Sequence, residues 1–221
     1  MSPLVGLPRG APAGRLHLLP QRAAFDPDSS VLLVADLHLG KAVTYRTLGV
    51  PVPEATTDET LRRLDEALAA TEARQVVFLG DLLHSRRALA PGTLDAFERW
   101  RSAHRDLSLI LVRGNHDDRA GDPPASLGIE VVDGPWRVGG WALMHEPVAV
   151  AGAYALGGHL HPGVAVQGRA LQRLRLPAFW FGPSVGVLPA FGEFTGLSTR
   201  PTVPIEQVYA IADGRVVQVP M

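Results

Sequence analysis

The sequence predicts an α/β protein, and three observations support this class. Short apolar runs bounded by turn residues recur along the chain, which is the pattern of buried strands. Two amphipathic patterns with helical spacing lie between the early runs. The chain has 221 residues, of which 46% are hydrophobic, and this composition is sufficient for a buried core and excludes a disordered protein.

A first helix is expected after Asp58, which can cap it, because Leu61 and Leu64 then fall on one face. A second helix is expected to begin at Pro91. After Gly121 the helical pattern fades, so we expect an α/β half joined to a mostly β half. Strands are expected at seven apolar runs: Leu16–Leu19, Val31–Ala35, Val76–Leu79, Leu107–Val112, Ile129–Val132, Trp141–Met144 and Val208–Ile211.

Residues 1–14 are rich in Pro, Gly and Ala and are expected to be a flexible lead-in, followed by a single domain over residues 15–221. The sequence shows neither a run of apolar residues long enough for a membrane span nor the pattern of a signal peptide. We therefore expect a soluble cytoplasmic protein with no membrane partner. The lack of cysteine excludes disulfides, thiolate metal sites and a cysteine nucleophile. The net charge of −1 disfavours nucleic-acid binding through bulk positive potential but leaves a local basic patch open.

Five polar clusters carry the chemistry of the sequence. They are Asp36-Leu37-His38, Gly80-Asp81, Gly114-Asn115-His116-Asp117, His145 and Gly158-His159-Leu160-His161. The first three come directly after predicted strands, and open α/β sheets bind ligands at the carboxyl ends of their strands. Five of the eight histidines fall in these clusters, and packing alone gives no reason for that placement. We therefore expect the clusters to converge on one site.

Carboxylates, an amide and several imidazoles are the ligands of a metal site with mixed oxygen and nitrogen donors. Without thiolates this set suits Mn, Fe, Zn or Co, whereas an oxygen-only Mg or Ca cage fits less well. The clusters hold too many ligands for one ion, and two ions that share a bridging carboxylate would use them all. Such pairs, about 3.5 to 4 Å apart, act on phosphoryl groups, so the residues indicate phosphoester hydrolysis.

The series DLH, GD, GNHD, H and GHLH over residues 36–161 resembles the calcineurin-like metallophosphoesterase superfamily, whose pattern is DxH, GD, GNH(D/E), H and GHxH. The resemblance implies a four-layer α/β/β/α sandwich, in which mixed β-sheets are flanked by helices. It implies that His116 stands beside the scissile phosphate as a general acid or charge stabiliser, oriented by Asp117. It also implies two sets of metal ligands that share Asp81 as a bridge: Asp36, His38 and His161 for one ion, and Asn115, His145 and His159 for the other.

Longer strings resemble one branch of this superfamily, the bacterial DNA ligase-associated metallophosphoesterases, also described as DNA damage response endonucleases. These strings are residues 35–41 (ADLHLGK), 80–85 (GDLLHS), 145–147 (HEP), 158–162 (GHLHP) and 188–196 (LPAFGEFTG). The resemblance implies a phosphodiesterase that depends on Mn²⁺ and acts on DNA, as single strands or at ends, in DNA repair. It also implies a functional association with a DNA ligase, a helicase and an exonuclease.

Four residues outside the ligand sets are candidates for substrate binding. Lys41, the only lysine, follows a predicted ligand by three residues and could meet a phosphate, and the alternative is a solvated loop lysine. Arg46 and Arg86 could follow a DNA backbone, although arginine is the default basic residue of this chain. His84 could touch bound phosphate or order a metal ligand through a hydrogen bond.

Three functions are consistent with these residues. The first is a two-metal phosphodiesterase that cleaves DNA strands or trims their ends. The second is a phosphatase or nucleotide phosphodiesterase for small molecules, which the near-zero net charge favours mildly. The third is a domain that binds a partner without catalysis, and the presence of every motif residue argues against it. Aromatic residues at 179–181 and 191–194 could stack on bases, although core packing is their more frequent role.

Overall fold

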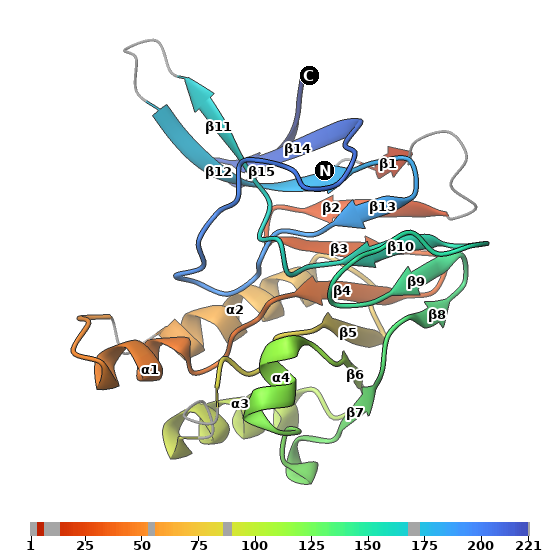
Figure 1. The fold of residues 1–221 in the computed structure, drawn as a ribbon. Coiled ribbons are helices and arrows are strands. Elements are labelled where there is room, and N and C mark those ends of the chain that lie inside the picture. Colours follow the sequence, from red (N-terminus) through yellow and green to blue (C-terminus); the bar gives the residue numbers. More distant parts are fainter. Residues whose placement is uncertain (1–3, 7–13, 53–55, 86–89, 168–172, 221) are drawn as a thin grey trace.

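A computed structural model of the chain describes residues 4–6, 14–52, 56–85, 90–167 and 173–220. Two β-sheets lie face to face, and helices cover the outer side of the first sheet (Figure 1). The first sheet has seven strands in chain order: β1 (Leu4–Gly6), β2 (Arg15–Leu19), β3 (Ala23–Asp26), β4 (Val31–Ala35), β5 (Gln75–Leu79), β6 (Ser108–Val112) and β7 (Ile129–Val132). Strands β4 to β7 are parallel, and the pairings from β1 to β4 are antiparallel.

The second sheet follows the order β15-β14-β12-β13-β10-β9-β8, and β11 pairs with β12 beside this path. It is also mixed, because β10 is parallel to both β9 and β13 whereas the other pairings are antiparallel. Its strands are β8 (Trp136–Val138), β9 (Trp141–Leu143), β10 (Tyr154–Gly157), β11 (Gly163–Gln167), β12 (Arg173–Phe181), β13 (Val185–Val187), β14 (Gln207–Ala212) and β15 (Arg215–Val219).

The described helices all precede residue 128. They are α1 (Lys41–Thr47), α2 (Thr56–Ala69), α3 (Pro91–Ala103), α4 (Asn115–Ala120) and the 3₁₀ helix η2 (Ala125–Leu127). The predicted helices are therefore confirmed as α2 and α3, although Asp58 lies inside the first turn of α2. A carboxylate there is favourable because the helix N-terminus is the positive end of its dipole.

Alternation along the strands divides the core into layers. In β4, Leu32 and Val34 point toward the helices and belong to the same apolar cluster as Leu64 of α2. Leu33 and Ala35 face the second sheet, because successive side chains of a strand point to opposite faces. Among the described residues, the apolar cluster on the outer side of the second sheet contains strand and loop residues and no helical one. The predicted α/β class, with two mixed sheets and flanking helices, is confirmed, and the described helices that reach the core, α2, α3, α4 and η2, cover the first sheet.

The seven predicted strands are present as β2, β4, β5, β6, β7, β9 and β14. The predicted lead-in contains a strand, β1, because three residues can pair with an edge through their backbone without any side-chain pattern. None of the described helices is long and apolar enough to span a membrane.

The parallel strands fix the place of the site. Ala35 at the end of β4 pairs with Leu79 of β5, and Leu79 pairs with Val112 of β6. The three loops that follow these strands therefore leave one edge of the sheet side by side. These are the loops that carry the first three polar clusters of the sequence.

Candidate metal centre

The structure brings the five polar clusters together at this edge of the first sheet. One group of atoms that could hold a metal ion comes from Asp36, His38 and His161, which is the first ligand set that the family resemblance implies. The Nε2 atoms of His38 and His161 lie 3.4 Å apart, and Nε2 of His161 lies 3.8 Å from Oδ1 of Asp36. All three side chains are buried or half-buried.

The second ligand set gathers around the ring of His145. Its Nε2 atom lies 2.9 Å from Oδ1 of Asn115 and 3.0 Å from Nδ1 of His159. Its Nδ1 atom lies 3.1 Å from the carbonyl oxygen of Leu79. A carbonyl only accepts hydrogen bonds, so Nδ1 carries the proton and Nε2 presents a lone pair to the site.

Asp81 stands between the two sets. Its Oδ1 atom lies 3.4 Å from Nε2 of His145, and its Oδ2 atom lies 3.9 Å from Nε2 of His38. The residue is 2% exposed, so its charge is not screened by solvent. This is the position that a bridging carboxylate requires.

The chemistry of these donors fits a pair of divalent ions. Imidazole nitrogens point at one another and at carboxylates over 3.0 to 3.9 Å, and lone pairs at these distances repel unless a cation or a proton lies between them. Burial, with the nearby charge of Lys41, lowers the pKa of His38 far below its usual range. His38 is therefore neutral at neutral pH, which is the state in which an imidazole binds a metal.

Five of the predicted ligands adopt a left-handed backbone conformation. They are Asp36 (φ 51°), His38 (φ 47°), Asp81 (φ 50°), His159 (φ 65°) and His161 (φ 45°). Such conformations cost about 1 to 3 kcal/mol each and persist where the surrounding structure holds them, most often at functional sites. Gly80 shows how tight these surroundings are, because a Cβ atom there would lie 2.2 Å from Nδ1 of His145.

Among the described residues, no hydrogen bond joins Asp117 to the ring of His116, so the orienting role of Asp117 stays a prediction. The Nδ1 atom of His116 lies 2.9 Å from the carbonyl oxygen of His84, so the ring is held by the main chain. The buried Asp117 carboxylate instead accepts the amides of Leu83 (3.1 Å) and Gly114 (3.0 Å), which ties two ligand loops together. Burial raises the pKa of Asp117, and these two hydrogen bonds partly oppose the rise.

Lys41 lies at the start of α1 and is 8% exposed, so it is not a solvated loop lysine. Burial lowers its pKa, and the carboxylates of Asp36 and Asp81 oppose this effect. Its Nζ atom lies 6.0 Å from the centre of the Tyr45 ring. The structure therefore places the charge of Lys41 close to the ligand carboxylates, on the side of the first set.

His84 is packed among the site histidines. Its ring stacks on His116 at 5.3 Å and meets the edge of His38 at 5.4 Å. Burial, with the charges of Lys41 and His116, lowers the pKa of His84 to about 4. Arg46 donates to the carbonyl oxygen of Val52 at 3.4 Å and lines a hollow between the starts of α2 and α3. Arg86 lies outside the described residues.

The sequence did not indicate which groups support the first ligand set. Phe191 and Gly192 donate their amides to the carbonyl oxygens of Ala35 and Asp36. In the sequence, residues 188–196 show a resemblance to a family pattern and aromatic residues that could stack on bases, and Phe191 is fully buried. The buried positions of Phe179 and Phe181 agree with a core role and not with base stacking.

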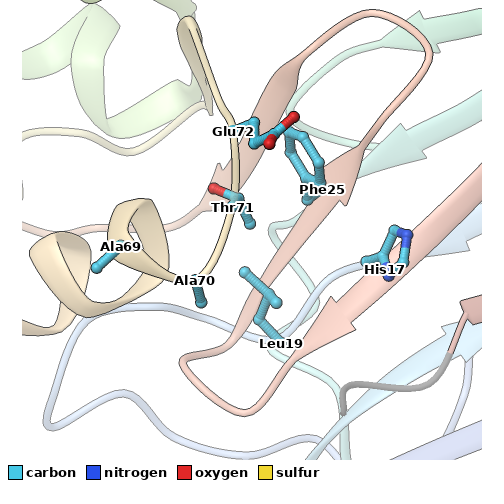
Figure 2. Close-up of a pocket in the computed structure, with 7 residues that line it drawn as sticks. All are labelled: His17, Leu19, Phe25, Ala69, Ala70, Thr71 and Glu72. Atoms are coloured by element: carbon cyan, nitrogen blue, oxygen red, sulfur yellow. The ribbon is translucent and has the colours of Figure 1, made fainter.

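A larger hollow, of about 450 Å³, lies away from these residues (Figure 2). It is formed by His17, Leu19 and Phe25 of β2 and β3 and by the end of α2 with the turn after it, at 69–72. None of the predicted site residues lines it. It is therefore not part of the candidate metal centre.

Comparisons with known proteins agree with this geometry. The model of the calcineurin-like phosphoesterase family matches residues 29–163. The crystal structure of the Pseudomonas putida nuclease MPE is 42% identical, covers 99% of this chain and 100% of that chain, and superposes with a TM-score of 0.85. Yfce, a phosphoesterase from E. coli, is 16% identical over 86% of this chain and 97% of that chain, with a TM-score of 0.42. None of the curated proteins matches the chain.

Proposed function

Because this chain belongs to the calcineurin-like phosphoesterase family and is a metal-dependent phosphoesterase, we propose that it hydrolyses phosphodiester bonds of DNA with a two-metal site. The observation that carries the hydrolytic part is the position of Asp81 between two sets of imidazole ligands. The DNA part is supported by the similarity over nearly the full length to a Pseudomonas putida nuclease. The strings shared with the DNA ligase-associated branch point the same way.

In this proposal, Asp81 bridges two ions. One ion is held by Asp36, His38 and His161, and the other by Asn115, His145 and His159. Two divalent ions bound there would supply positive charge for the phosphoryl oxygens and a nucleophile at neutral pH. The imidazole donors favour a transition metal, and we propose Mn²⁺, with Fe, Zn or Co as the alternatives.

His116 has the geometry of a general acid. Its Nδ1 proton is donated to the carbonyl oxygen of His84, which fixes the ring and leaves Nε2 on the side of Asp81, 3.9 Å from Oδ2. The backbone amide of His116 also donates to Oδ1 of Asp81 at 3.0 Å, so the ring and the bridge keep a fixed relation. A protonated Nε2 can then give its proton to the leaving oxygen of a bound phosphodiester.

Two further residues have proposed roles toward the substrate. Lys41 provides a positive charge beside the first ligand set, where it can attract a phosphate oxygen. His84 positions His116 through its carbonyl oxygen and its stacked ring. We propose that this enzyme acts on single-stranded DNA or on DNA ends, in cytoplasmic DNA repair alongside a ligase, a helicase and an exonuclease.

A side-by-side assay tests the proposal. Protein loaded with Mn²⁺ is incubated with labelled single-stranded DNA, duplex DNA and cyclic nucleotides, and the Asp81→Asn variant serves as the control for contaminating nucleases. We expect cleavage of DNA that the variant lacks. Turnover of cyclic nucleotides without DNA cleavage would favour the small-molecule phosphodiesterase, with which the net charge of −1 also agrees. No turnover of any substrate would contradict an enzymatic function.

A further inference from the structure

A short segment late in the chain lies against the loop that carries the first metal ligand. Ala190 forms a parallel bridge with Ala35, the last residue of β4. The amide of Phe191 donates to the carbonyl oxygen of Ala35 at 2.8 Å, and the amide of Gly192 donates to that of Asp36 at 3.1 Å. Residues 190–192 therefore contact the backbone of a predicted ligand directly.

The carbonyl groups of this segment accept from arginines of two other elements. Arg63 of α2 donates to the carbonyl oxygen of Phe191 at 2.8 Å, and Arg22 of the turn between β2 and β3 donates to that of Gly192 at 3.4 Å. The amide and carbonyl groups of both residues are thus engaged. The segment connects the two guanidinium groups to the Asp36 loop.

The Glu193 carboxylate lies between the two arginines. It forms an ion pair with Arg63 and lies 3.7 Å from Arg22. Burial and the charge of Arg63 lower the pKa of Arg22, and the charge of Glu193 opposes this effect. We call Arg22, Arg63 and Glu193 the Glu193 clamp. Their side chains are 14 to 30% exposed, so solvent screens these charges only in part.

Gly192 shows that the contact with the Asp36 loop is close. A Cβ atom on this residue would lie 2.3 Å from the carbonyl oxygen of Leu37 and 3.2 Å from that of Asp36. Asp36 itself has a φ of 51°, a conformation that an aspartate keeps only where neighbouring groups hold it. The clamp and Gly192 are among the groups that do so.

The same segment reaches the second side of the first ligand set. The amide of Ser198 donates to the carbonyl oxygen of His161 at 2.9 Å, and Gly163 donates to that of Ser198 at 2.8 Å. Residues 190–198 thus contact the backbones of Asp36 and His161. Within the described part of the chain they make no hydrogen bond to the second ligand set of Asn115, His145 and His159.

We propose that Arg22, Arg63 and Glu193 are positioning residues for the first of the two metal ions. They hold residues 190–193 against the backbone of the Asp36 loop, and thereby keep Asp36 in the conformation from which its carboxylate, which also accepts the amide of His159 at 2.9 Å, reaches that ion. The inference rests on the two ligand sets of the proposed function and makes no assumption about the substrate. Groups that orient a metal ligand contribute about 10- to 100-fold to metal affinity.

The test separates the two ions with ligand variants. His159→Ala weakens the second set and leaves the first, whereas His161→Ala does the reverse. Arg63→Met and Glu193→Gln are added to each background and to the otherwise unchanged chain. Arg62→Met is the matched control, because Arg62 is the residue before Arg63 in α2 and, among the described residues, pairs with Glu59 and Glu66 on the exposed face. Equilibrium dialysis against Mn²⁺ gives the affinity and number of bound ions, and circular dichroism gives the Tm of the metal-free protein.

We expect Arg63→Met and Glu193→Gln to lower Mn²⁺ affinity about 10- to 100-fold in the His159→Ala background. In the His161→Ala background the affinity should change less than about threefold, and Arg62→Met should change neither. When the same variants are made in the otherwise unchanged chain, one of the two Mn²⁺ ions should bind more weakly and the other should keep its affinity. If Arg63→Met does not fold, Glu193→Gln, which keeps the side-chain volume, is judged by the same criteria.

Two results would overturn the proposal. One is a lower Tm with unchanged affinity for both ions, which would make the clamp a purely structural contact. The other is an equal loss of both ions. If the ligand variants do not each retain one ion, the ligand assignment of the proposed function fails, and the ion count in the otherwise unchanged chain still decides whether the clamp serves one ion.

Discussion

The carbonyl oxygen of His84 lies 2.9 Å from Nδ1 of His116, so the main chain orients the imidazole that stands beside Asp81. A carbonyl acceptor fixes the ring without adding a full negative charge beside it. The ring keeps its direction whether Nε2 is protonated or not, because Nδ1 remains the donor in both states. This relationship suits a group that gives up a proton and regains it in each turnover.

The first prediction concerns this proton. His116→Ala should lower kcat on a DNA phosphodiester about 10²- to 10⁴-fold, because the alkoxide leaves poorly without protonation. The loss should be much smaller on a p-nitrophenyl phosphodiester, whose leaving group needs no proton. Both ions should stay bound. An equal loss on both substrates, or the loss of an ion, would show that His116 is an electrostatic stabiliser or a ligand instead.

The second prediction separates Asp117 from His116. Asp117 is fully buried, and its two oxygens accept the amides of Leu83 and Gly114, so Asp117→Asn should destabilise the fold by about 1 to 3 kcal/mol, because the NH₂ group of asparagine leaves one of these amides facing another donor. Urea unfolding of the metal-free variant measures this cost. The ratio of the rates on DNA and on the p-nitrophenyl substrate should stay near that of the unchanged protein. A ratio that moves toward that of His116→Ala would support an orienting role for Asp117.

The third prediction concerns the bridge. Asp81→Asn should abolish activity and weaken the binding of both ions, because a neutral amide cannot offset the repulsion between two adjacent divalent cations. Metal analysis after gel filtration should find less than one ion per chain, and a chelator should strip the variant faster than the unchanged protein. Full metal content with near-normal turnover would refute the bridging position.

The fourth prediction concerns Lys41, whose buried charge lies near the carboxylates of Asp36 and Asp81. Lys41→Met should raise KM for DNA about tenfold, which corresponds to the loss of one charge-assisted hydrogen bond to phosphate. Mn²⁺ affinity should stay equal or increase, because a competing cation has been removed. An unchanged KM with weaker metal binding would make Lys41 a support for the ligands and not a phosphate contact.

The fold could be predicted where a strand is encoded by its own residues. Runs such as Val31–Ala35 are fully buried and apolar, and each ends at a turn that carries a polar motif. Strand β13 (Val185–Val187) could not be predicted, because it has three residues with a glycine in the middle. Its pairing depends on β10 and β12, which contact it only in the folded chain.

The features of the site also fall into those that the sequence predicts and those that only the folded chain reveals. The convergence of the five polar clusters could be predicted, because metal binding demands particular residue types in ordered motifs. The partner of His116 could not, because a backbone carbonyl leaves no trace in the residue type at position 84. The burial of Lys41 was also hidden, since a lysine in a loop bounded by glycine has the pattern of a solvated residue. The contacts of Glu193 join residues 130 and 171 positions apart in the chain, and only the fold brings them together.

The last prediction concerns alkaline pH, away from the site. The hydroxyl of the buried Tyr154 lies 2.8 Å from the carbonyl oxygen of Gly182 and 3.0 Å from that of Val185. Burial, with the charge of Glu206, raises the pKa of Tyr154 above its ordinary value of about 10. The folded state therefore holds this proton at a pH where the unfolded chain releases it. The resulting stability is fully present below pH 10 and is lost as the pH rises toward the folded-state pKa.

We therefore expect Tyr154→Phe to lower the free energy of unfolding by about 1 kcal/mol at pH 7, through its lost hydrogen bonds, and to reduce the fall in stability above pH 10. Urea unfolding of metal-free protein between pH 7 and pH 11 measures both effects, since metal release then makes no contribution. Tyr209→Phe is the comparison, because burial raises the pKa of Tyr209 as well. This variant should remove a separate part of the loss of stability at alkaline pH. An alkaline fall that is unchanged in Tyr154→Phe would show that the folded protein releases this proton as readily as the unfolded chain does.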